Sequence, residues 1–200
     1  MQNKKDYQLV SIVGFLVGWL ILLPAAGFGI SVTPLLAVLS VVGFTVFAIA
    51  AMAALLWLSR FWSSFREIGK FAAVGTLNSF IDLAILNLLI FATGATVGFV
   101  FIVIKYLAFM IAAVNSYFWN KFWTFGSRLP VTFTESVRFA IFTGVGAVIN
   151  SLVAYAIVTF IAAPAPLTMH GWDNVAAVLA IFANMVWNFL TYKKIVFKNQ

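Results

Sequence analysis

The chain has 200 residues, of which 64% are hydrophobic, 17% aromatic and only 8% charged. A soluble domain carries about 25% charged residues, so a mean hydropathy of +1.09 excludes an ordinary soluble domain and a disordered chain. With no cysteine, one histidine and five acidic residues, the sequence excludes thiolate chemistry and leaves little material for a metal cluster or an acid–base pair. A net charge of +7 in such a chain reports topology and contact with anionic lipid rather than nucleic acid.

Six apolar runs are each long enough to cross a bilayer as a helix, because a helical span needs about 20 residues. They cover residues 9–30, 34–59, 71–93, 98–119, 139–163 and 174–192. The runs are continuous, whereas the strands of a membrane β-barrel alternate lipid-facing and lumen-facing residues. The sequence therefore predicts an all-α polytopic membrane protein with six transmembrane helices. Within these helices, Pro34 suits a first-turn position and Pro24 predicts a kink.

The basic residues lie on one side of the predicted membrane. Every lysine and arginine except Lys105 falls outside the spans, in the two termini and in the segments after spans two and four. The other three connecting segments, residues 27–33, 94–97 and 164–173, contain none. The positive-inside rule then predicts a multi-pass protein of the cell (plasma or inner) membrane with both termini in the cytoplasm. Residues 60–70 mix cations with aromatics, which fits either a short interfacial helix or a solvated linker.

The last four spans form an internal repeat. Span three opens with Lys70-Phe71, and span five opens with Arg138-Phe139 68 residues later. The ends of spans four and six match at an offset of 72, where NKFWTF begins at Asn120 and YKKIVF at Tyr192. Each unit is a hairpin of two spans with a basic-aromatic tail, so the repeat is parallel. We predict an N-terminal two-helix addition over residues 1–69 and a four-helix domain over residues 70–200, with repeat units 70–125 and 138–197.

The doubled pattern resembles the GtrA-like family of small membrane proteins over about residues 70–197. The shared features are a cation and Phe that open a span, a hairpin, and an Asn-x-x-x-Asn-Lys/Arg-x-Trp-x-Phe exit. Ser116 replaces the first Asn of exit one, beside Asn115, whereas exit two keeps Asn188 but has Tyr192 and Ile195 in place of the second Asn and the Trp.

The resemblance implies a membrane protein that takes part in the transport of lipid-linked sugars. Members of the family are associated with the translocation of polyprenyl-phosphate-linked sugars, such as undecaprenyl phosphate-glucose, for the modification of cell-surface polysaccharides. The implied partner is a glycosyltransferase that makes the lipid-linked sugar on the cytoplasmic face.

Polar residues inside the spans are the first set of candidates. Asp82 and Lys105 lie at similar estimated depths in spans three and four, so we predict that they pair. A lone charge at mid-membrane costs at least about 2.5–3.5 kcal/mol, which favours either a structural ion pair or a polar site. Close packing explains the small residues on the same helix faces. The polar residues predicted to line a groove for a sugar headgroup are Asn78, Asp82, Lys105, Asn115, Asn120, Asn150, Asn184 and Asn188.

Cations at the cytoplasmic ends of the spans are the second set. Lysine offers a phosphate a point charge and arginine a bidentate contact, although positive-inside residues also serve topology alone. The residues predicted to hold the lipid phosphate are Lys70, Lys121, Arg138, Lys193 and Lys194. In span one, Gly14 and Gly18 form a GxxxG pattern, which predicts a helix contact within the chain or in a homo-oligomer.

Three classes of function remain open. The leading one is a transporter that helps polyprenyl-phosphate sugars to cross from the cytoplasmic to the outer leaflet. The second is a membrane anchor that recruits a glycosyltransferase and moves nothing. The third is a small multidrug exporter, in which Asp82 would couple protons to cationic cargo although Lys105 would neutralise it. An enzyme is the least favoured class, no metal or cofactor is expected, and no G-x-x-x-x-G-K-[ST] loop is present to use ATP directly.

Overall fold

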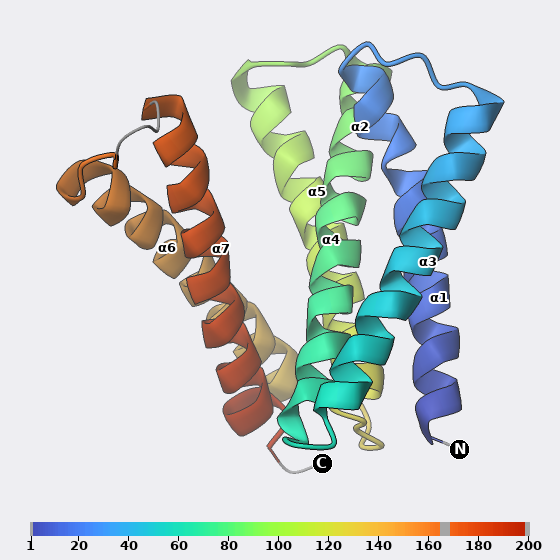
Figure 1. Cartoon of the computed structure of the whole chain (residues 1–200). Coiled ribbons are helices and arrows are strands. Elements are labelled where there is room, and N and C mark those ends of the chain that lie inside the picture. The colour runs from blue at the N-terminus through green and yellow to red at the C-terminus, as the bar shows by residue number, and fades with distance from the viewer. Residues whose placement is uncertain (1, 165–168, 199–200) are drawn as a thin grey trace. The chain divides into compact units, whose positions relative to one another are not determined.

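The computed structural model describes residues 2–164 and 169–198, which are helical apart from short connections (Figure 1). The elements in chain order are α1 (Gln2–Leu20), α2 (Leu22–Gly27), α3 (Pro34–Leu58), α4 (Ser64–Thr93), α5 (Gly98–Trp119), η1 (Asn120–Thr124), α6 (Phe133–Phe160), α7 (Met169–Thr191) and η2 (Tyr192–Val196). The elements η1 and η2 are short π-helices that continue α5 and α7. No strand occurs among these described residues, and the predicted all-α fold is confirmed.

Six stretches of the described chain are long and apolar enough to cross a membrane. They are Asn3–Gly27, Pro34–Leu58, Ser64–Thr93, Gly98–Thr124, Phe133–Phe160 and Val175–Val196. Many large apolar side chains on these helices are exposed, as expected where the surrounding solvent is hydrocarbon. The predicted number of spans is therefore confirmed.

The two prolines act as the sequence predicted. Pro24 has no N–H to donate to the carbonyl of Leu20, and α1 ends at Leu20 with a break before α2. Pro34 occupies the first turn of α3, and the hydroxyl of Thr33 caps that helix by accepting a hydrogen bond from the Leu36 N–H at 3.2 Å.

Three spans begin earlier than the sequence indicated, at Asn3, Ser64 and Phe133 instead of residues 9, 71 and 139. Within the segment 60–70, residues 60–63 belong to the linker between α3 and α4, whereas residues 64–70 form the first turns of α4 and not a separate interfacial helix. This start is fixed by packing, since the Leu55 side chain of α3 lies close against Gly69. Similarly α6 begins at Phe133 rather than near residue 139, because the Thr132 hydroxyl accepts from the Glu135 N–H at 3.2 Å and caps the helix.

The chain divides into two compact units, Met1–Gly126 and Ser127–Gln200. In unit one, α1 packs against α3 and α4, and α4 packs against α5; in unit two, α6 packs against α7. Repeat unit 70–125 therefore shares a compact unit with the N-terminal helices, while repeat unit 138–197 lies in the other. The core of unit one consists of Val10, Val13, Val17, Met52, Leu56, Val74, Leu77 and Trp123.

The GxxxG pattern of α1 forms a helix contact within unit one. A Cβ added at Gly14 would lie 2.7 Å from the Phe44 carbonyl oxygen, and one added at Gly18 would lie 2.5 Å from Val41 Cα. The Ser40 hydroxyl donates a 2.9 Å hydrogen bond to the Gly18 carbonyl, which the missing side chain leaves accessible. These glycines bring the α1 and α3 backbones together, as small residues do in membrane helix pairs.

Candidate functional site

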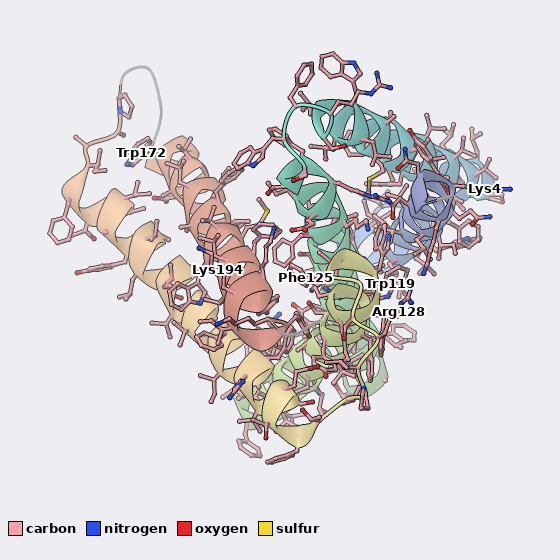
Figure 2. The ribbon with its side chains drawn as sticks, turned by 90° about the horizontal axis from the view of Figure 1, so that it is seen from below. Lys4, Trp119, Phe125, Arg128, Trp172 and Lys194 are labelled. Atoms are coloured by element: carbon pink, nitrogen blue, oxygen red, sulfur yellow. The ribbon has the colours of Figure 1, made fainter. Side chains whose placement is uncertain are left out.

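The exits of the two repeat units adopt the same local structure. The Phe125 N–H donates to the Asn120 carbonyl at 2.9 Å, and the Phe197 N–H donates to the Tyr192 carbonyl at 2.8 Å, which are the i→i+5 bonds of a π-helix. Figure 2 shows Phe125 on the segment that follows α5. The bonded residues of the two exits are 72 residues apart, which is the offset that aligned the exits in the sequence. The repeat therefore extends to the backbone geometry.

Each exit is fastened to the start of its own unit by an aromatic pair. The rings of Phe71 and Phe125 are 6.5 Å apart in unit one, and those of Phe139 and Phe197 are 6.5 Å apart in unit two. These phenylalanines are the residues that the sequence pattern places at the span start and at the exit. In both hairpins, therefore, a Phe–Phe contact joins the exit to the start of the first helix at the basic end.

The predicted ion pair between Asp82 of α4 and Lys105 of α5 is present. Lys105 Nζ lies 2.7 Å from Asp82 Oδ2, and the side chains are 46% and 23% exposed for Lys105 and Asp82. The second carboxylate oxygen, Asp82 Oδ1, has no hydrogen-bond partner among the residues that the structure describes. One carboxylate oxygen is thus paired with Lys105, and the other is a buried acceptor without a described donor.

A second polar contact joins the same two helices. Asn115 Nδ2 donates to Asn78 Oδ1 at 2.6 Å, and Asn78 lies one turn before Asp82 along α4. We call Asn78, Asp82, Lys105 and Asn115 the polar strip. Its four side chains were each predicted as site residues, and the structure brings them together in two adjacent pairs between α4 and α5.

Unit two carries a different amide cluster. Asn188 Nδ2 donates to Asn184 Oδ1 at 2.8 Å, and these α7 side chains fill the space beside Gly146 of α6, where an added Cβ would lie 2.6 Å from Asn188 Oδ1. Asn188 Oδ1 is buried and accepts no hydrogen bond within the described chain. Asn150 is half-buried one turn further along α6. The structure therefore joins Asn184 with Asn188, while Asn150 takes part in no contact that defines the cluster.

Asn120 lies inside unit one rather than on its surface. It is 1% exposed and donates to the carbonyl and the hydroxyl of Ser116 at 2.9 and 3.2 Å, one turn back along the helix. The matched residue of unit two, Tyr192, is also buried, and its hydroxyl is 2.6 Å from that of Thr143. Both exit residues thus hold polar atoms inside their own hairpins.

The five predicted phosphate ligands fall into two groups. Lys70 and Lys121 are buried, and Lys121 is 0% exposed, so a lipid phosphate would reach them only inside unit one. Arg138 and Lys194 are exposed, and Lys193 is half-buried with Nζ 5.8 Å from the ring of Phe189. A role in phosphate binding remains a prediction for all five.

Sequence reasoning missed a residue that organises the basic end of unit one. Asp6 of α1 is 2% exposed, and its carboxylate receives Arg66, Lys70 and the indole of Trp123. The available signal was that Asp6 is the only acidic residue before Glu67, on the side of the membrane that carries the cations. The sequence alone did not indicate that α1 would bring it into contact with the start of α4.

A family model described as GtrA/DPMS, transmembrane domain, matches residues 70–197. The chain belongs to this family. The match confirms the resemblance seen in the sequence, with the same boundaries. It supports a multi-pass membrane protein that is associated with polyprenyl-phosphate sugars. The GtrA/DPMS domain begins at Lys70, so Asp6 and the N-terminal helices lie outside it.

Neither the curated proteins nor the solved structures contain a match to the chain. Among the described residues, no three His, Cys, Asp or Glu side chains gather as a metal site.

Proposed function

We propose that this GtrA/DPMS protein moves polyprenyl-phosphate-linked sugars from the cytoplasmic to the outer leaflet of the cell membrane. The process involves no covalent step; the protein supplies a polar path for the headgroup while the prenyl chain stays in lipid. Its orientation in this proposal has both termini in the cytoplasm, as the distribution of lysine and arginine predicts.

The observation that carries the proposal is the polar strip along α4 and α5. Placing charged and amide side chains in a span is costly, and such residues usually pair or face a polar path. Asp82 Oδ1 is buried, whereas the Lys105 side chain is 46% exposed, so the Lys105 ammonium is the donor of the pair that a sugar hydroxyl can accept from. The paired cation at 2.7 Å keeps the strip near neutral, so a neutral sugar meets no net charge.

The exposed cations Arg138 and Lys194 are the candidates in unit two for holding the lipid phosphate. An arginine binds a phosphate through two N–H groups, and a lysine adds a second positive charge. Both residues stand at the basic end of unit two, where the positive-inside rule places the cytoplasmic headgroups. These cations would hold the lipid phosphate at the cytoplasmic surface.

Reconstitution of the full chain in liposomes tests the proposal. Undecaprenyl phosphate-glucose and a panel of related lipids are added, and a reagent that does not cross the membrane reports the lipid exposed on the far side. We expect the protein to accelerate exposure, and the double variant Asp82→Asn/Lys105→Met to lose at least about tenfold of that rate, equivalent to about 1.4 kcal/mol. No acceleration for any lipid in the panel would contradict the proposal.

Ser79→Ala is the matched control on the same helix. The Ser79 hydroxyl is exposed and donates at 3.1 Å to the Gly75 carbonyl of its own helix, so its removal leaves the polar strip intact. We expect this variant to transport at the wild-type rate. A protein that only anchors a glycosyltransferase would give no acceleration in any variant, and a co-purification with that enzyme would then survive the loss of the polar strip.

A further inference from the structure

Four side-chain nitrogen atoms from two elements lie close to the Asp6 carboxylate. Arg66 contacts Oδ2 through Nε at 2.7 Å and through a terminal nitrogen at 2.6 Å. Lys70 Nζ lies 3.2 Å from Oδ1, and the indole Nε1 of Trp123 donates to Oδ1 at 3.1 Å. The Asp6 side chain is 3% exposed, so this is a buried site and not a surface ion pair.

The donors form a site for an oxyanion in general. A guanidinium, an ammonium and an indole N–H donate hydrogen bonds and accept none, which leaves an anion with several oxygens as the fitting ligand. Arginine binds carboxylates and phosphates alike through its planar guanidinium, and lysine binds both as a point charge. The three donor residues lie in α4 and η1, and the carboxylate comes from α1. Lys70 and Trp123 fall within the GtrA/DPMS match, whereas Arg66 and Asp6 precede it.

Unit two does not repeat this donor set. Arg138 matches Lys70 at the 68-residue offset, but Thr134 stands where Arg66 is expected. Ile195 matches Trp123 at the 72-residue offset and has no N–H in its side chain. The site therefore belongs to unit one, the unit against which the N-terminal helices pack.

We propose that Arg66, Lys70 and Trp123 form a phosphate-binding site that Asp6 keeps closed. The N-terminal helix fills the site with its own carboxylate, and a phosphate oxyanion takes the same donors when that carboxylate is absent. The source of the phosphate is either a lipid headgroup or free phosphate. The site is separate from the polar strip, so its test does not depend on transport.

The experiment compares Asp6→Ala with the wild-type chain in detergent. Removing the carboxylate leaves the buried Lys70 and the half-buried Arg66 without their shared anion, and we expect a lower melting temperature in chloride buffer. Inorganic phosphate at equal ionic strength should raise the melting temperature of Asp6→Ala by at least about 2 °C, because a ligand that binds the folded state stabilises it. The wild-type chain should not respond, since its site is filled.

Two control variants make the result specific. Asp6→Ala/Arg66→Gln/Lys70→Gln removes the donors as well, and it should not respond to phosphate. Asp173→Ala removes an exposed carboxylate elsewhere and should behave as the wild-type chain. A phosphate response of equal size in all variants, or none in Asp6→Ala, would overturn the proposal.

The second arm identifies the source of the phosphate. Asp6→Ala is placed in nanodiscs of phosphatidylcholine with or without phosphatidic acid, which carries a phosphate monoester, and melting is measured again. Stabilisation by phosphatidic acid assigns the site to a lipid headgroup, and stabilisation by inorganic phosphate alone assigns it to a soluble ion. If Asp6→Ala does not fold in chloride, we expect monodisperse protein only when phosphate is present during solubilisation. If neither Asp6→Ala nor the milder Asp6→Ser folds in chloride or in phosphate buffer, the proposal would also be overturned.

Discussion

Asp82 and Lys105 meet at 2.7 Å inside two helices that are long enough to span a membrane. Replacing one of them leaves the other as an unpaired charge at that depth. We expect Asp82→Asn or Lys105→Met each to lower the free energy of unfolding by about 3 kcal/mol, and the double variant to recover most of that loss. Thermal or denaturant unfolding in detergent measures the three values. Additive losses in the double variant would show that the two charges are not coupled.

The exposed and buried cations lead to opposite expectations. Arg138→Gln/Lys194→Gln should weaken binding to vesicles that contain a polyprenyl phosphate, and the loss should shrink as salt is raised, because exposed charges are screened. Lys70→Gln should instead lower stability and leave lipid binding unchanged, since Lys70 Nζ already contacts Asp6 and the Trp123 carbonyl. Vesicle co-sedimentation at two salt concentrations separates the two effects. Equal lipid affinity in both variants and the wild-type chain, with folding intact, would contradict this assignment.

At the scale of elements, the contact between α1 and α3 depends on a glycine. A side chain at Gly18 would strike the backbone of Val41, which cannot move aside as a flexible side chain can. We expect Gly18→Val to destabilise unit one by about 1–3 kcal/mol, the usual cost of overpacking. Gly43→Ala is the matched control, because nothing lies within 4 Å of its added Cβ. The melting temperatures of the two variants should differ clearly, and equal values would contradict the contact.

The hairpin exits are the elements in which sequence and structure agree most closely. Asn120 and Tyr192 differ in chemistry, yet each begins a π-helix whose closing Phe packs on the Phe that opens its unit. The pattern was visible in the sequence because the aromatics and cations recur at a fixed offset. The π geometry was not, since it depends on hydrogen bonds shifted by one residue that no local pattern specifies.

For the whole molecule, the distribution of charge predicts a topology that a reporter can test. Fusions after Asn3 and after Gln200 should give cytoplasmic signals, and a reporter inserted in residues 94–97 should give an external one. The reason is that the segments on the second side contain no lysine or arginine. An external signal at either terminus would contradict the predicted orientation and also the direction of transport in the proposed function.

The sequence by itself determined the number of spans, the tandem repeat and the family. The lengths of the apolar runs define the spans, and the spacing of the cations and aromatics defines the repeat and the family pattern, so neither needs the tertiary structure. It also predicted the Asp82–Lys105 pair, since a short loop joins their helices and depth follows from the rise per residue. Only the tertiary structure decided the environment of Asp6, whose partners Arg66 and Trp123 are 60 and 117 residues away. It likewise decided that Lys121 is buried. Contacts of that separation depend on which helix faces pack together, and in unit one the close approach of α1 to α3 and α4 sets those faces.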